Sequence, residues 1–456
     1  MAEKPSIPRG TRDFGTTEMA RRTYIFDTIR QTFRRFGFQP IETPAMENLS
    51  VLLGKYGEEG DKLLFRIVNS GDFLKDTNVE DYQKGSKHFI TKIAEKGLRY
   101  DLTVPFARYV VMNRHQLTFP FKRYQMQPVW RGDNPQKGRY REFYQCDADV
   151  VGTDSLLCEA EIIAMIQEVF QNLGIQHYTI KLNNRKILTA LAEVVGAHGK
   201  EAELCVAIDK LEKIGREKVN EELRERGFST EAIARLYPIL DVKGDNTTQL
   251  NALKTIFQSV SVGLKGIAEL EEVLEYVVAM HLDTTKIAFD ISLARGLSYY
   301  TGIILEVKVD GIQMGSVSGG GRYDNLTGVF GLEGVSGVGF SFGVDRLYDV
   351  LDELQLFPAQ SADSTQLLIC CLDKENFPKA LAIAQSFRKS GIRTEVYPEV
   401  AKIKKQLTYA NNKQIPFAAI LGSEEVKASK ITLKNLNSGE QHLFTVEEAI
   451  TAIGQL

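Results

Sequence analysis

The sequence is poor in the residues from which metal centres, disulfide frameworks and membrane spans are made. Its 456 residues include five cysteines, six histidines and one tryptophan. No two cysteines form a Cys-x-x-Cys pair and the histidines are scattered, which argues against a zinc site. No apolar run approaches the ~18 residues that a spanning helix needs. We therefore expect reduced thiols in the core, no disulfide and no membrane contact.

The chain also lacks an excess of charge of either sign, because 56 Lys and Arg nearly balance 59 Asp and Glu, for a net charge of −3. Such a chain has no global attraction to nucleic acid, so any RNA contact must rest on local basic surface. With 43% hydrophobic and 25% charged residues, the composition is that of an ordinary folded protein of roughly two to four domains. The first residues lack the apolar core of a signal peptide, and we expect a cytoplasmic location.

The chain up to about residue 356 mixes helix and strand patterns. Ile25, Ile29 and Phe33 recur at helical spacing within residues 17–36. Between about 185 and 283, heavily charged, helix-favouring segments replace the strand signals and predict a helical insertion. The other expected elements are a strand at 38–43, an antiparallel hairpin of strands 122–131 and 140–151, a helix at 155–173, strands between 287 and 342, and a helix at 344–354.

The last part of the chain has a different, alternating pattern. Residues 357–363 are typical of a linker, and strands and helices alternate after it. We expect strands at 367–372, 393–397 and 417–421 and helices at 377–389 and 402–411, which predicts a small α/β domain with a largely parallel sheet. The predicted boundaries are a core in two parts, 1–184 and 286–356, an insertion at 185–285, the linker at 357–363 and the last domain at 364–456.

The most informative stretch is 293–302, which sets Arg295, Tyr299 and Tyr300 in an apolar context. Burying a guanidinium is costly unless an anion meets it, so this stretch indicates a site for a negatively charged ligand. A structural salt bridge from Arg295 to Asp290 or Glu306 is the alternative.

Polar residues gather in two further stretches. Asp101 and Thr103, two positions apart, would share one face of an extended segment and could bind an ammonium group. Around the turn of the expected hairpin, Arg131, Arg139 and Arg141 offer forks for phosphate. Gln145 and Asp149 follow on the returning strand, and their equal parity predicts that they lie on one face.

Two glycine-rich stretches are weaker signals. Residues 319–324 contain three consecutive glycines, where a ligand could approach the backbone, although a tight turn or bulge is the simpler explanation. Residues 337–346 predict a glycine-spaced strand that enters a helix whose first turn presents Arg346. Neither stretch has the pattern of a P-loop or of a dinucleotide-binding turn, so nucleotide binding would need another scheme.

Together these residues resemble a class II aminoacyl-tRNA synthetase, specifically the histidyl-tRNA synthetase family, over essentially the whole chain. Residues 38–47, 130–143 and 337–346 are similar to the three motifs that class II synthetases share. Residues 293–302 and 320–324 resemble the histidine-specific signatures, and 144–149 resembles the eukaryote-like branch. Two positions depart from the family's pattern: Ser298 stands where the signature has aspartate, and Asp133 stands where many relatives carry glutamate.

The resemblance implies an α+β fold: an antiparallel-sheet catalytic core with a helical insertion and a C-terminal α/β anticodon-binding domain. It implies ATP-dependent attachment of L-histidine to tRNA(His) through a histidyl-adenylate, by a homodimer, with Mg2+ accompanying ATP and no tightly bound cofactor. Asp101, Thr103 and Gln145 would bind the α-amino group, and Asp149 and Tyr300 the imidazole. Arg131 and Arg295 would be the catalytic residues, which hold the α-phosphate and the carboxylate, and Tyr299 would lie in the histidine site. The residues implied to contact ATP are Asp133, Arg139 and Arg346. Those implied to contact the tRNA acceptor stem are Gln136 and Lys137.

Three other classes of protein share part of this pattern. The regulatory subunit of ATP phosphoribosyltransferase resembles the synthetase core and binds histidine without charging tRNA, but such paralogues tend to lose the equivalent of Arg295 and the anticodon-binding domain. A sister class II synthetase would keep the three shared motifs without residues 293–302. A protein that only binds RNA would not explain why arginines are expected at buried, substrate-like positions. The sequence reveals no dedicated protein ligands for a metal.

Overall fold

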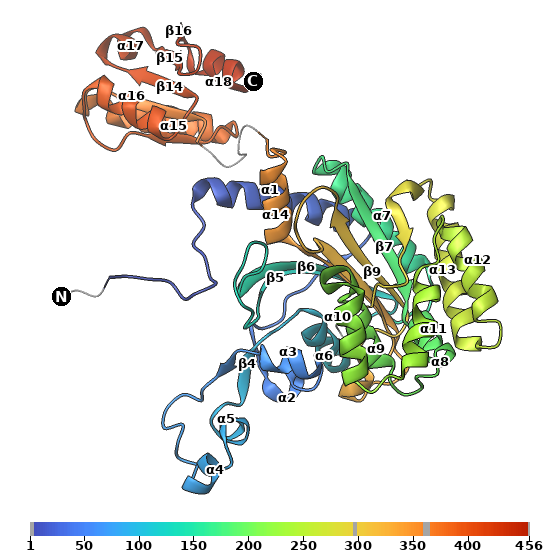
Figure 1. The fold of residues 1–456 in the computed structure, drawn as a ribbon. Coiled ribbons are helices and arrows are strands. Elements are labelled where there is room, and N and C mark those ends of the chain that lie inside the picture. The colour runs from blue at the N-terminus through green and yellow to red at the C-terminus, as the bar shows by residue number, and fades with distance from the viewer. Residues whose placement is uncertain (1–3, 295–298, 359–364, 455–456) are drawn as a thin grey trace. The chain divides into compact units, whose positions relative to one another are not determined.

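The computed structural model describes residues 4–294, 299–358 and 365–454, and the chain divides into two units, Met1–Phe357 and Pro358–Leu456. Each unit has a hydrophobic core of its own. Figure 1 follows the chain through both. Among the described helices, none is long and apolar enough to cross a membrane. All five cysteines are free and buried, which confirms the expectation of reduced core thiols.

The first unit is built around an eight-stranded sheet in the order β1-β5-β6-β11-β10-β9-β7-β8. All its pairings are antiparallel except β1 with β5 and β7 with β8. Its strands are β1 (Gln39–Pro40), β5 (Phe121–Trp130), β6 (Glu142–Val151), β7 (Tyr178–Asn184), β8 (Ile287–Phe289), β9 (Ile303–Val309), β10 (Ser318–Tyr323) and β11 (Gly337–Gly343). The predicted hairpin is confirmed as β5 and β6, whereas the strand expected at 38–43 shrinks to the two residues of β1.

The two faces of this sheet differ in chemistry because side chains alternate along each strand. In β6, Cys146, Ala148 and Val150 point into the main hydrophobic core. Gln145, Asp147 and Asp149 have the opposite parity and line a cavity. The sheet therefore has an apolar face that packs on helices and a polar face that is free to form a site.

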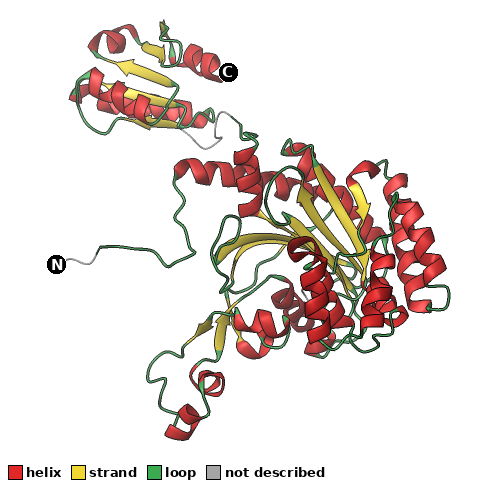
Figure 2. Cartoon of the chain, in the orientation of Figure 1, coloured by secondary structure: helices red, strands yellow, loops and turns green. Residues whose placement is uncertain are grey.

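Helices cover the apolar face, and Figure 2 shows them against the strands. The contacts come from α1 (Thr16–Arg35), α7 (Leu157–Asn172), α13 (Ser261–Ala279) and α14 (Val344–Glu353), which contact strands of the sheet and one another. In α1 the buried residues include Ile25, Ile29 and Phe33, the residues that predicted the helix. This layer fixes the sheet from one side.

Between β7 and β8 the described chain is helical. Asn184 ends β7 and begins the next helix, because its side chain accepts a hydrogen bond from the backbone N–H of Lys186. The helices are α8 (Arg185–Val194), α9 (Glu201–Ile208), α10 (Leu211–Glu225), α11 (Thr230–Leu240), α12 (Asn246–Ile256) and α13. α13 packs against α8 and α7, which ties this segment to the sheet.

A smaller three-stranded sheet, in the order β2-β4-β3, precedes β5. In Figure 1 the short helices α4 and α5 lie away from the main sheet. The elements are β2 (Met46–Asn48), α2 (Leu49–Leu52), α3 (Gly57–Lys62), β3 (Arg66–Ile67), α4 (Val79–Gln83), α5 (Ser86–Ile93), β4 (Lys96–Leu98) and α6 (Thr103–Asn113). Asp101 and Thr103 follow β4 directly, so this sheet delivers them to the polar face of the large one.

The second unit is an α/β fold on a five-stranded sheet in the order β13-β12-β14-β15-β16. The three expected strands, β13, β12 and β14, are parallel as predicted, and two further strands that were not predicted, β15 and β16, extend the sheet in antiparallel pairing. The elements are β12 (Leu367–Cys371), α15 (Phe377–Lys389), β13 (Thr394–Val396), α16 (Ile403–Asn412), β14 (Phe417–Leu421), α17 (Ser423–Ala428), β15 (Ile431–Asn435), β16 (Gln441–Phe444) and α18 (Val446–Gly454).

Candidate active site

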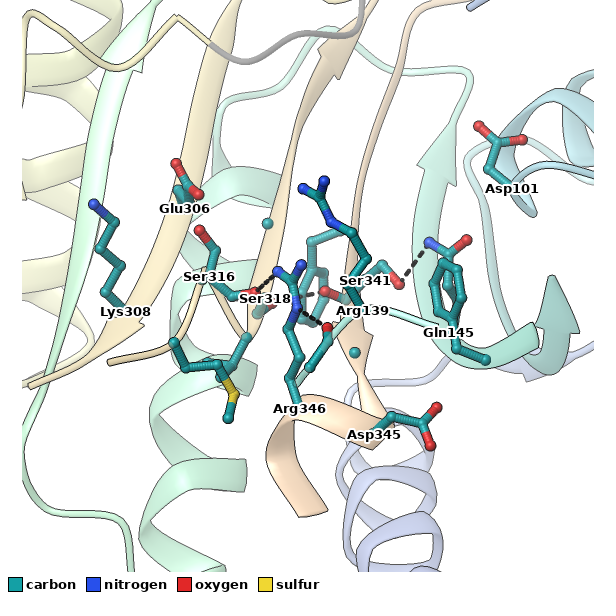
Figure 3. A pocket seen from close by; sticks show the side chains of 18 of the residues that line it. Asp101, Arg139, Gln145, Glu306, Lys308, Ser316, Ser318, Ser341, Asp345 and Arg346 are labelled. Carbon is teal, nitrogen blue, oxygen red and sulfur yellow. Dashed lines mark hydrogen bonds between the residues drawn. The ribbon is translucent and has the colours of Figure 1, made fainter. Parts of the chain in front are cut away.

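A cavity of about 1320 Å³ lies on the polar face of the large sheet. Figure 3 shows part of its lining, with Asp101 and Gln145 to one side of Arg139 and Arg346. Twelve residues that the sequence singled out line it: Asp101, Thr103, Arg131, Asp133, Gln136, Lys137, Arg139, Gln145, Asp149, Tyr299, Tyr300 and Arg346. Arg295 and Ser298 lie outside the described residues.

Asp101 reaches the cavity with one carboxylate oxygen occupied and one open. Its Oδ1 accepts hydrogen bonds from the Tyr56 hydroxyl at 3.0 Å and from the backbone N–H of Val104 at 3.1 Å. Its Oδ2 is buried without a hydrogen-bond partner among the described residues. Thr103 begins α6, so the two residues lie at a helix start and not in an extended segment as expected. Burial raises the pKa of Asp101.

Asp149 is held by two partners inside the sheet. Its Oδ1 accepts a 2.6 Å hydrogen bond from the Tyr323 hydroxyl, and its Oδ2 lies 2.7 Å from Nη2 of the buried Arg123. Arg123 stands opposite Asp149 in the register of β5 and β6. Burial raises the pKa of Asp149, while Arg123 and the Tyr323 hydroxyl act to lower it. The guanidinium makes a buried carboxylate tolerable here.

Asp147 is a third buried carboxylate of the cavity, between Gln145 and Asp149 on the same face of β6. Burial raises its pKa to about 7, with Arg123 lowering it and Asp149 raising it. No role was predicted for Asp147 from the sequence. Parity alone could have found it, because Asp147 shares the face of Gln145 and Asp149.

The glycines of β10 and β11 make room for these side chains. A Cβ on Gly339 would overlap the Asp149 carboxylate, and one on Gly320 would overlap the backbone of β11. The turn or bulge considered for residues 319–324 was wrong, since residues Ser318–Tyr323 form a central strand paired on both sides. Glycine is required there by close packing between strands.

Three arginines also line the cavity: Arg139 and Arg346 form an arginine end away from Asp101 (Figure 3), whereas Arg131 lies near Asp101 and acts to lower its pKa. Arg131 donates from Nε to the carbonyl oxygen of Tyr100 at 3.0 Å, and its guanidinium lies 5.1 Å from the centre of the Phe143 ring. Arg346 donates to the carbonyl oxygens of Gly138 at 2.8 Å and Ser316 at 2.5 Å. Arg139 is about half exposed and lies 3.7 Å from Asp133. A ligand with a cationic end and several anionic groups would match this separation of charge.

The loop 131–141 that carries Arg131 and Arg139 is anchored at both ends. The backbone N–H of Arg141 donates to the carbonyl oxygen of Gly10 at 2.8 Å. Near the tip, exposed Lys137 pairs with Glu353 of α14 at 2.8 Å. The tip of the loop therefore presents Lys137 in an exposed ion pair, which is weak enough for another anion to take the place of the Glu353 carboxylate.

Comparison with known proteins identifies the family. The profile described as "Histidyl-tRNA synthetase" matches residues 92–347, and that described as "Anticodon binding domain" matches 366–456. The histidine–tRNA ligase of Cytophaga hutchinsonii is 59% identical over 448 residues, which cover 98% of this chain and 99% of that protein. That of Porphyromonas gingivalis is 58% identical, with 98% of each chain covered. The chain belongs to the histidyl-tRNA synthetase family.

Solved structures agree with this assignment. The histidyl-tRNA synthetase of Nostoc sp. PCC 7120 superposes with a TM-score of 0.83 at 32% identity, with 99% of each chain covered. A Bacillus halodurans C structure titled as an ATP phosphoribosyltransferase regulatory subunit/histidyl-tRNA synthetase shares the fold, with a TM-score of 0.70 at 20% identity over 93% of this chain and 99% of that one. The predicted fold class and the family resemblance are thus confirmed.

Proposed function

We propose that this member of the histidyl-tRNA synthetase family attaches L-histidine to its tRNA in two steps, through a histidyl-adenylate. The observation that carries this is one cavity with buried carboxylates at one end and Arg139 and Arg346 at the other, in a chain 59% identical to a histidine–tRNA ligase. A second unit that matches the anticodon-binding profile supplies a candidate surface for tRNA.

We place histidine at the carboxylate end. Asp101, Thr103 and Gln145 would bind the α-ammonium group, and the open Asp101 Oδ2 is an acceptor suited to it. Asp149 and Tyr300 would meet the two ring nitrogens, with Tyr299 beside them. An apolar side chain of similar size would offer no hydrogen bond to either group, which favours histidine.

We place ATP at the arginine end, with Mg2+ arriving as part of the substrate. In the first step a carboxylate oxygen of histidine bonds to the α-phosphorus while the bond to the bridging oxygen breaks and pyrophosphate leaves. Arg131 and Arg295 would stabilise the charge that builds between the two anions. Arg139 and Arg346 would hold the γ-phosphate, and Asp133 would contact ATP. Among the described residues, no three His, Cys, Asp or Glu side chains gather as a metal site.

In the second step a hydroxyl of the 3′-terminal ribose of tRNA attacks the histidyl carbonyl and AMP leaves. Gln136 and Lys137, at the tip of the loop beside the cavity, would contact the acceptor stem. We further propose that the enzyme is a homodimer, with residues 38–47 contributing to the interface, and that it acts in the cytoplasm, where tRNA is used. Residues 185–285 would form an insertion in the catalytic core.

Aminoacylation tests this function. Purified protein is incubated with ATP, Mg2+ and unfractionated bacterial tRNA, and each labelled amino acid is offered in turn. Acid-precipitable label with histidine alone is the expected result. Label with another amino acid would assign a sister synthetase, and binding of histidine without charging would assign the non-catalytic paralogue.

A further inference from the structure

Several acceptor atoms of the cavity have no hydrogen-bond partner among the described residues. Three of these acceptors are Asp101 Oδ2, Gln145 Oε1 and Asp147 Oδ1, and each is buried from solvent. All three side chains line the same cavity. A buried acceptor left unpaired is costly, so these atoms indicate a ligand that brings several N–H or O–H donors.

The residues opposite Asp147 in the sheet make no hydrogen bond to its Oδ1. In the sheet register it stands between Gln125 of β5 and Ser341 of β11. The Gln125 amide nitrogen already donates to Thr43 at 2.8 Å and to Gln127 at 2.5 Å. Ser341 accepts from the Gln145 amide at 3.1 Å, and its hydrogen bonding acts to lower the pKa of Asp147. One hydroxyl proton cannot satisfy both carboxylate oxygens, and Oδ1 stays open.

The adjacent carboxylate differs from Asp147 in its partners. Asp149 pairs with Arg123 at 2.7 Å and also accepts from Tyr323. Arg123 forms its ion pair with Asp149 and acts on Asp147 only through its charge, which lowers the pKa of Asp147. Asp147, only 2% exposed, has no basic side chain within ion-pair distance among the described residues. A cation from outside the chain would complete its environment.

We propose that Asp147 is a specificity-determining residue that accepts a hydrogen bond from the α-ammonium group of histidine. This rests on the proposed histidine site. An ammonium group has three N–H donors, and Asp101 Oδ2, Gln145 Oε1 and Asp147 Oδ1 are three open acceptors, with the Thr103 hydroxyl beside them sharing one of these donors. Gln145 and Asp147 are linked through Ser341, so the two present their oxygens from one rigid strand.

The proposal predicts how the pocket discriminates between analogues of histidine. L-Histidinol keeps the ammonium and imidazole groups and lacks the carboxylate. The deaminated analogue 3-(imidazol-4-yl)propionate keeps the imidazole and carboxylate and lacks the ammonium. Only ligands with the ammonium can use Asp147, so a variant at Asp147 should lose affinity for histidine and histidinol and not for the deaminated acid.

Calorimetric titration of the full-length protein with these three ligands tests it. Asp147→Asn, of nearly the same shape, should weaken histidine and histidinol roughly tenfold or more and leave the deaminated acid within about twofold. The matched control is Asp352→Asn, which removes a surface carboxylate that pairs with Arg21 at 2.7 Å and should change none of the three. If Asp147→Asn does not fold by thermal melting, Asp147→Ser provides the second variant.

Each result has one meaning. Equal loss for all three ligands would move the Asp147 contact to the imidazole and overturn the proposal. Unchanged affinities in a folded variant would make Asp147 purely structural and also overturn it. If the unaltered protein binds neither histidine nor histidinol, the proposed function itself fails, which is a different outcome from a failure of Asp147 alone.

Discussion

Tyr323 donates a 2.6 Å hydrogen bond to Oδ1 of Asp149, across 174 positions of sequence. The bond connects β10, where the glycine-rich signature lies, to β6 at the floor of the cavity. Both side chains are almost completely buried. This hydrogen bond and the ion pair with Arg123 hold the Asp149 carboxylate, which we propose contacts the imidazole of histidine.

Tyr323→Phe is expected to weaken histidine binding without unfolding the protein. The change removes one buried hydrogen bond to a charged group, worth about 1.5–3 kcal/mol, and keeps the ring. The KM for histidine in ATP–pyrophosphate exchange should rise about tenfold or more. The control is Tyr276→Phe, whose hydroxyl donates to Glu272 on the surface at 2.8 Å. An unchanged KM for Tyr323→Phe would show that Asp149 is positioned without it.

Arg295→Ala is expected to slow adenylate formation. Loss of one preorganised donor to a developing charge costs about 10²–10³ in kcat. Pre-steady-state formation of histidyl-adenylate measures this directly. Arg30→Ala, which removes an arginine paired with Asp27 on the surface of α1, should be without effect. Near-normal turnover of Arg295→Ala would contradict the role given to this arginine.

Gln136→Ala and Lys137→Ala should impair transfer to tRNA and spare adenylation. Both residues lie at the tip of the loop 131–141, and Lys137 can exchange Glu353 for a phosphate. We expect the KM for tRNA to rise several-fold, while ATP–pyrophosphate exchange stays unchanged. Glu353→Ala breaks the same ion pair but leaves the lysine, so it should not reduce charging. Normal tRNA kinetics in both loop variants would rule out this contact.

Asp147→Asn should stabilise the ligand-free protein at pH 8 more than at pH 5. Burial raises the pKa of Asp147 to about 7, so between about pH 4 and 7 the folded state keeps a proton that the unfolded chain has released. The stability from this group is present at low pH and falls as pH rises through that window. Arg123, Asp149 and Asp101 are the charged groups that act on it, with Gln125, Gln145 and Ser341 beside it.

Thermal melting at the two pH values measures this effect. The variant should melt about 2–5 °C above the unaltered protein at pH 8 and close to it at pH 5. Asp352→Asn again provides the exposed control. A difference in melting temperature that does not change with pH would mean that Asp147 does not hold a proton in the folded state.

Much of the fold was predictable because periodicity reports burial. The pattern of Ile25, Ile29 and Phe33 predicted α1, and α15 and β14 begin and end at the residues expected. Pairing of strands was less accessible. The antiparallel β15 and β16 were not predicted, because both are short and β16 is largely exposed, so neither has the apolar run of a buried strand.

Residues of the site could be predicted where a charged side chain stands among apolar residues, because burying it there has no evident structural benefit. Asp101, Asp149 and Arg346 are examples. It was not predictable where function depends on contact across the fold. Nothing in the sequence near Tyr323 reveals that its hydroxyl meets Asp149. Asp147 was not predicted, although the alternation of side chains along β6 puts it on the same face as Gln145 and Asp149.

ATP–pyrophosphate exchange with each amino acid separately tests the central claim most directly, because it measures formation of the adenylate without tRNA. The account predicts exchange with histidine and with no other amino acid, in the presence of Mg2+. Exchange with a different amino acid, or none while histidine still binds, would contradict it.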